Sequence, residues 1–162
     1  MRTRRRVLAV CGAGLSATAG CLTRTGPDIP REARILDARA SIEAGGYQTW
    51  DLAERVGAAS LGPVDGRYVF SYEFTVQRGP DVTLAVTGPE SLERRAETGG
   101  QYRVFLGTRS HGQQGHASES MPAGLLDVLV ADTRHVGPGT PRPGRGAARV
   151  HVQAYLARPG GG

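Results

Sequence analysis

The stretch from Arg67 to Gln77 reads Arg-Tyr-Val-Phe-Ser-Tyr-Glu-Phe-Thr-Val-Gln and decides the fold class of this chain. Its large apolar residues recur at every second position, namely Tyr68, Phe70, Tyr72, Phe74 and Val76. Successive side chains of a strand point to opposite faces. The period of two therefore predicts a strand with one face in a core and the other in solvent.

Shorter segments with the same alternation lie on both sides of this stretch, separated by turns rich in glycine and proline. We expect strands at residues 35–42, 47–54, 82–86, 102–106, 117–121, 126–130 and 150–156, the first two joined as a hairpin by residues 44–46. Only Pro89–Thr98 is typical of a helix, because proline and acidic residues come first and arginines follow. This spacing predicts an all-β, antiparallel, jelly-roll-like sandwich of about eight strands with one short helix. The expected core includes Phe70, Phe74, Leu84, Val128 and Val152.

The first twenty-one residues indicate export. Arginines, including Arg4 and Arg5, precede a short apolar run that ends at Ala19-Gly20-Cys21. A positive region, a short apolar region and small residues are typical of a signal peptide. The arginine pair resembles a twin-arginine export signal, and the residues before Cys21 resemble a lipobox. This resemblance implies passage through the twin-arginine translocase, cleavage between Gly20 and Cys21, and a lipid on Cys21.

Domain organisation can be read from this leader and from the turns. We expect a signal peptide at 1–20, a flexible tether at 21–33, the β-sandwich domain at 34–158 and a disordered tail at 159–162. The mature protein would lie on the extracytoplasmic face of the cell membrane, held there by its lipid.

Composition excludes several classes of function. The formal net charge is +5, but residues 1–20 carry four arginines and no acids, so the mature chain is close to neutral. We therefore expect no nucleic-acid partner. Lysine is absent, which excludes Schiff-base and P-loop lysine chemistry, and a lipidated Cys21 would leave no free thiol.

Three short motifs support a resemblance: residues 40–50, the Tyr72–Val82 stretch with its Gly79-Pro80-Asp81 turn, and the Met121-Pro122-Ala123-Gly124 turn. Together they resemble the β-sandwich domain of haloarchaeal-type lipoproteins exported by the twin-arginine route, and more distantly GOLD-like and bacterial pre-peptidase C-terminal-like domains. The resemblance implies binding or adhesion and carries no catalytic residues over.

Four histidines invite a metal hypothesis. His111 and His116 lie in the polar segment Ser110–His116, which we expect to be a loop, and His135, His151, Glu119 or Asp132 could supply a third ligand. His151 alternates with two valines and should point away from the core. We expect no metal or other cofactor, because loop ligands need a third group on a rigid element.

Hydrolytic sites are the second hypothesis. Ser110, His111 and Asp132 could form a Ser-His-Asp set, although no Gly-x-Ser-x-Gly elbow occurs. Glu73 and Glu119 could form a carboxylate pair for glycoside cleavage, but both are expected as solvating charges on outer strand faces.

The remaining aromatic pair is Tyr47 and Trp50. Their opposite parity in a strand places them on opposite faces, so they are not a sugar-stacking platform, and we expect Trp50 in the core.

These observations favour a non-catalytic, membrane-anchored binding, adhesion or accessory module for an envelope protein or glycan, and we expect no enzyme activity. The alternative is a small extracytoplasmic metal-binding or hydrolytic protein that uses His111 and His116.

Overall fold

A computed structural model describes residues 29–98, 110–134 and 146–160. The leader with Arg4, Arg5, Gly20 and Cys21 lies outside these residues, as do His135 and the strand expected at 102–106. Within the described residues, no helix has the length and hydropathy needed to cross a membrane.

Strand β3 (Arg67–Arg78) is the centre of the fold, and its alternation predicts its faces correctly. Its inward aromatic side chains and Val76 are at most 7% exposed. It pairs with β6 (Gln114–Pro122) on one side and with β8 (Ala148–Ala157) on the other. Burial of four large aromatic side chains on one strand makes this face the main apolar surface of the core.

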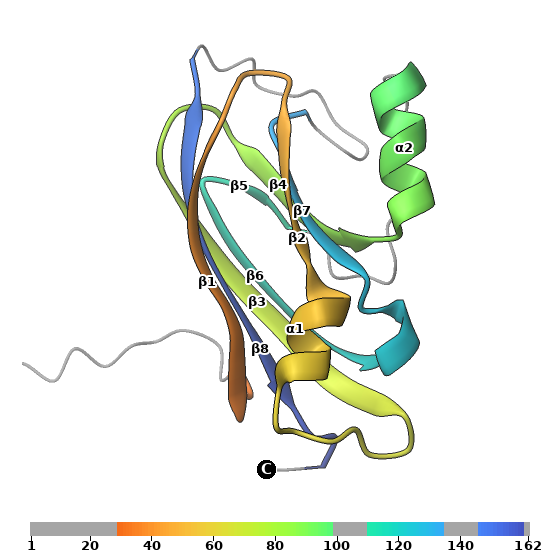
Figure 1. Cartoon of the computed structure of the whole chain (residues 1–162). Helices are drawn as coiled ribbons and strands as arrows, with labels where there is room; N and C mark the ends of the chain where they lie inside the picture. The colour runs from red at the N-terminus through yellow and green to blue at the C-terminus, as the bar shows by residue number, and fades with distance from the viewer. Residues whose placement is uncertain (1–28, 99–109, 135–145, 161–162) are drawn as a thin grey trace, which may run out of the picture.

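Eight strands form two four-stranded antiparallel sheets in the described residues (Figure 1). Sheet A has the order β1-β8-β3-β6 and begins with β1 (Ala33–Ile42). Sheet B has the order β2-β7-β4-β5, formed by β2 (Tyr47–Asp51), β7 (Val128–Asp132), β4 (Val82–Thr87) and β5 (Ser110–Gly112). Every connection except β4 to β5 passes from one sheet to the other. This is the strand order of a jelly roll, and it confirms the predicted all-β sandwich.

The turn at residues 44–46 does not close a hairpin, contrary to our expectation. Its backbone does turn, with Gly45 at φ 78° and the Gly46 amide 2.8 Å from the Glu43 carbonyl oxygen. The strands that it joins belong to different sheets, because β1 pairs with β8 and β2 pairs with β7. A local turn signal does not say which partner a strand finds across the core.

A second helix interrupts the strand expected at 47–54. Strand β2 ends at Asp51, whose carboxylate accepts a hydrogen bond from the Glu54 amide at 2.8 Å and caps α1 (Leu52–Ala58). Asp51-Leu-Ala-Glu54 is a capping-box type of sequence. The buried Leu52 then anchors the helix to the core. The expectation of one helix was therefore wrong, although α2 (Pro89–Thr98) has the expected bounds, and a short 3-10 turn follows at Ala123–Leu125.

Both faces of β7 are apolar, which reverses its expected orientation. Leu129 and Ala131 point into the main core. Val130 points outward with Ala85 of β4, and both are covered by Leu92 of α2. Val128 shares this outward parity and is only half-buried, so its assignment to the core was wrong. Because a helix covers this face, alternation alone could not identify the inner one.

Candidate functional site

His111 and His116 lie on opposite surfaces of the molecule. The segment expected as a loop is instead β5, a short turn and the start of β6, and these strands belong to different sheets. His111 pairs in register with Thr83 on the outer face of sheet B, whereas His116 pairs with Glu73 on the outer face of sheet A. The two imidazoles therefore point away from each other across the whole sandwich.

Each imidazole has a distinct environment. His111 Nδ1 lies 2.8 Å from Thr83 Oγ1, and its Nε2 lies 3.7 Å from an Asp81 carboxylate oxygen. The His116 side chain is exposed on the edge strand of sheet A. In the described part of the chain, no group of three His, Cys, Asp or Glu side chains could hold a metal ion.

Ser110 and His111 also point to opposite sides of their strand. The Ser110 hydroxyl faces the core, where it donates to the His116 carbonyl oxygen at 2.9 Å and lies 3.2 Å from the Tyr72 hydroxyl. Asp132 shares the outer face with His111, but Thr83 stands between them in the register. The structure therefore does not assemble the Ser-His-Asp set.

Glu73 and Glu119 are separated by sheet A itself. Glu73 lies on the outer face, as expected. Glu119 pairs in register with the inward-facing Phe70, so its side chain has inward parity, contrary to the expectation of an outer position. Strand β6 is an edge strand, where an inward carboxylate stays half-buried rather than enclosed. The two carboxylates do not form a glycosidase pair.

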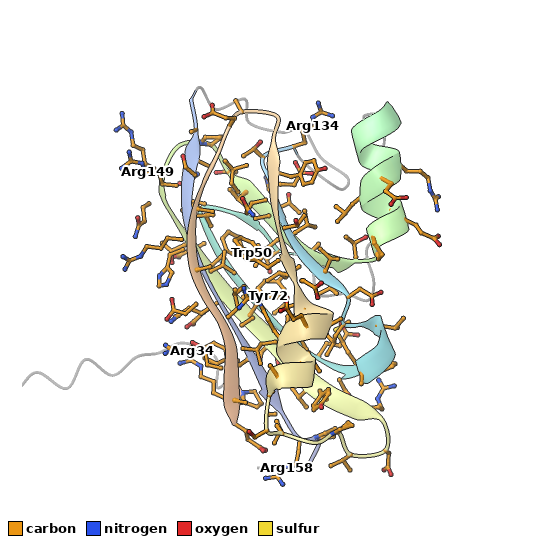
Figure 2. All side chains as sticks on the ribbon, in the orientation of Figure 1. Arg34, Trp50, Tyr72, Arg134, Arg149 and Arg158 are labelled. Carbon is orange, nitrogen blue, oxygen red and sulfur yellow. The ribbon has the colours of Figure 1, made fainter. Side chains whose placement is uncertain are left out.

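Trp50 and Tyr47 follow their predicted parity. Trp50 packs against the main core, and Tyr47 packs on the other face of sheet B against Ala85 and Val130. Figure 2 shows Trp50 and Tyr72 between the sheets, away from the arginines at the surface.

The two outer faces of the sandwich differ in how they are covered. On sheet B, α2 lies over β4 and β7 (Figure 1), and even the outward polar side chains of Thr83, Thr87 and Asp132 are fully buried. No described helix covers sheet A. Its outer face carries a continuous set of polar and charged side chains, which makes it the candidate functional site.

At the Ala33 end, the incoming chain closes part of this face. Ile29 is 8% exposed, and the Ser71 hydroxyl donates to the Pro30 carbonyl oxygen at 3.1 Å. The Arg31 guanidinium lies 3.0 Å from a Glu73 oxygen and 4.8 Å from the centre of the Tyr155 ring. Burial, followed by the Glu73 carboxylate, raises the pKa of the Tyr155 phenol. The chain is thus packed against the sheet several residues before Arg34.

A second network lies beside it on β1 and β8. Asp37 is 2.7 Å from His151 Nε2, 3.1 Å from Gln153 Nε2 and 2.9 Å from Arg34 Nη1. The hydrogen bond with His151, and then that from Gln153, lowers the pKa of the Asp37 carboxyl. His151 points away from the core, as its alternation predicts.

The rest of the outer face, toward the Ile42 end of β1, stays open. Its exposed side chains come from all four strands: Arg39, Ser41, Thr75, Gln77, Arg78, Gln114, His116, Ser118 and Arg149. Apart from His116, none of these residues stands out in the sequence. The alternation within β3 and β8 shows which of these side chains point outward. Only the pairing register of the four strands shows that the outward side chains are neighbours.

No protein-family model matches the chain, and no curated protein matches it. The resemblance to haloarchaeal-type lipoproteins and GOLD-like domains stays a prediction. The geometry of sheet A is therefore the main guide to function.

Proposed function

We propose that this chain is an exported, lipid-anchored binding module that engages an envelope component through the outer face of sheet A. The observation that carries this proposal is the asymmetry of the two outer faces. One is covered by α2, whereas the other is polar, exposed and built from four paired strands.

The chemistry of this face supports binding rather than catalysis. Its ionisable side chains near the Ala33 end are engaged with one another, as in the Asp37–His151 and Arg31–Glu73 pairs. Charged groups held by several partners present a fixed pattern of donors and acceptors. Such a surface gives orientation and specificity to a bound partner.

The sequence of the first twenty-one residues supports the lipid anchor in this proposal. A thioether lipid on Cys21 would hold the domain at the membrane by a short chain, because residues 29–32 already pack against sheet A and residues 22–28 span at most roughly 25 Å when extended. Two acyl chains are needed, since a single chain binds a membrane only marginally.

Membrane fractionation tests the anchor. Cys21→Ala should release the protein from the membrane pellet, and the matched variant Cys11→Ala should leave it there. Equal retention of both variants would contradict the lipid anchor.

Photo-cross-linking in intact cells tests the binding face. A benzoylphenylalanine placed at Thr75, in the middle of the outer face, should give a discrete cross-linked species. The same group at Glu54 of α1 or Glu90 of α2 is the control, since both positions are exposed elsewhere on the molecule. Cross-links of equal yield at all three positions, or at none, would refute binding through sheet A.

A further inference from the structure

Three arginines form an unneutralised patch at the Ile42 end of sheet A. Arg149 of β8 lies directly opposite Arg78 of β3, and Arg39 of β1 is the diagonal neighbour of Arg149 through its pairing with His151. All three side chains are exposed (for Arg149, see Figure 2). We refer to Arg39, Arg78 and Arg149 as the basic patch.

None of these three guanidiniums has a hydrogen bond or an ion pair in the described parts of the chain. Other arginines of this face do have partners. Arg31, Arg34 and Arg158 each bind a carboxylate at 2.9–3.0 Å. The Arg67 guanidinium donates to the Ser120 hydroxyl and carbonyl oxygens. The nearest carboxylate on β1, Asp37, is already held by Arg34, His151 and Gln153.

The backbone brings Arg78 to this position by a distortion. The register shifts between Val76 and Arg78, so Gln77 is an extra residue and Arg78 returns to the outer face instead of pointing inward. A bulge commonly re-aims a side chain in this way. The next residue, Gly79, has φ 100° and packs so closely on the backbone of Ala147 and Ala148 that no Cβ fits.

This arrangement has a cost in stability that a ligand would remove. Like charges directly opposite each other in a strand pair are destabilising. An oxyanion between Arg78 and Arg149 would accept charge-assisted hydrogen bonds from both, in the geometry that guanidinium groups favour. Arg39 lies two strand spacings across from Arg78 and is offset from it by two residues along β8, a separation of roughly 12 Å, so a second anionic group is needed to meet it.

We propose that the basic patch binds an acidic polysaccharide of the envelope, with sugar carboxylates on the arginines. This inference rests on the proposed function and names the chemistry of its partner. Hydroxyl and amide groups of Ser41, Thr75, Gln77 and Gln114 surround the patch and suit sugar hydroxyls. The patch lies at the opposite end of β1 from Ala33, where the proposed anchor chain enters (Figure 1). It therefore lies far from the point where the proposed anchor chain enters, which favours a partner other than the lipid headgroups of the anchoring membrane.

Binding of a fluorescent ten-unit galacturonic acid oligomer to the full-length chain tests this proposal, with a neutral dextran oligomer as the comparison ligand. We expect binding of the acidic oligomer only. The triple variant R39Q/R78Q/R149Q should weaken it about 100-fold and Arg149→Gln alone about tenfold, since hydrogen bonds to charged groups are among the stronger ones.

The matched control is R55Q/R94Q/R134Q, which removes the same charge from exposed arginines that lie outside the outer face of sheet A. It should change the affinity for the acidic oligomer less than about threefold. Every variant carries the same arginine-rich leader, so a difference in affinity between variants measures the contribution of the basic patch. Unchanged circular dichroism of both triple variants confirms that each is folded.

Three results would overturn the proposal: no binding of the acidic oligomer, an equal loss in the control variant, or a patch-dependent preference for phosphatidylcholine vesicles with 30 mol% phosphatidylglycerol. If the acidic oligomer does not bind but Thr75 still gives a discrete cross-link in cells, the polysaccharide proposal is wrong and the binding face is retained. If neither the binding nor the cross-link is observed, the proposed function is wrong as well.

Discussion

Replacement of Tyr72 by phenylalanine tests how the two sheets are held together. Tyr72 projects from β3 of sheet A and is fully buried. Its hydroxyl donates to the Leu84 carbonyl oxygen of sheet B at 3.0 Å and lies 3.2 Å from the Ser110 hydroxyl, also of sheet B. One hydroxyl therefore joins three strands across the apolar core.

The magnitude depends on the groups that Tyr72→Phe leaves without a partner. The ring stays, so no large cavity forms, but polar atoms of Leu84 and Ser110 lose a buried partner. Such a loss costs about 1–3 kcal/mol. For a domain of this size, the melting temperature should fall by about 3–10 °C.

Urea unfolding of the full-length chain measures this loss, with Trp50, the single tryptophan, as the fluorescent probe. The comparison variant is Tyr155→Phe, whose hydroxyl makes a long hydrogen bond of 3.3 Å to Glu73 within sheet A and does not join the two sheets, so its removal should cost less than that of the Tyr72 hydroxyl. The midpoint should shift for Tyr72→Phe without a change in slope. A shift below about 0.3 kcal/mol, or one no larger than in the comparison variant, would refute the inter-sheet role.

Four further expectations concern stability, each measured by denaturant or thermal unfolding. Phe70→Ala should cost about 3–5 kcal/mol, because it leaves a cavity at a fully buried position, and a loss below about 1 kcal/mol would contradict its place in the core. Gly79→Ala should cost more than about 2 kcal/mol, because its methyl group would overlap the Ala147 backbone at a positive φ; wild-type stability would show that the chain turns differently there. Arg149→Gln should stabilise the free protein by about 0.2–1 kcal/mol, since it relieves a like-charge pair, and destabilisation would contradict that pairing. Because the pKa of Asp37 is lowered in the folded protein, its ionised carboxylate should stabilise the fold above about pH 4, and this stability should be lost as the pH falls through the pKa of the folded state. Asp37→Asn should not show this loss, and parallel pH profiles of stability for the two proteins would refute the expectation.

The strand pattern of β3 predicts the fold class well, because a period of two with four aromatic residues has one physical solution, a half-buried strand. The prediction of which strand face points into the core fails where a helix covers the outer face of the sheet. Val128 and Val130 alternate as expected, but α2 buries Val130 from outside, so both faces of β7 are apolar. Local signals also compete, and the cap at Asp51 ends β2 where apolar content alone would extend it.

The candidate site was harder to predict than the fold. His111 and His116 are close in sequence, but the chain crosses from sheet B to sheet A between them. Arg39, Arg78 and Arg149 are far apart in sequence and meet only through the pairing of three strands and one bulge. Register of this kind depends on long-range partners, which a single sequence does not reveal.

The measurement that tests the central claim most directly is the reactivity of an introduced thiol on sheet A in living cells. Thr75→Cys places a thiol on the open outer face, and Glu54→Cys places one on α1 as the control. Each is labelled with a membrane-impermeant maleimide, first in intact cells and then in the purified protein. We predict that the thiol at position 54 reacts at similar rates in both, and that the thiol at position 75 reacts at least about fivefold more slowly in cells. Equal rates at both positions would contradict a bound partner on sheet A, and labelling only after lysis would contradict the extracytoplasmic location.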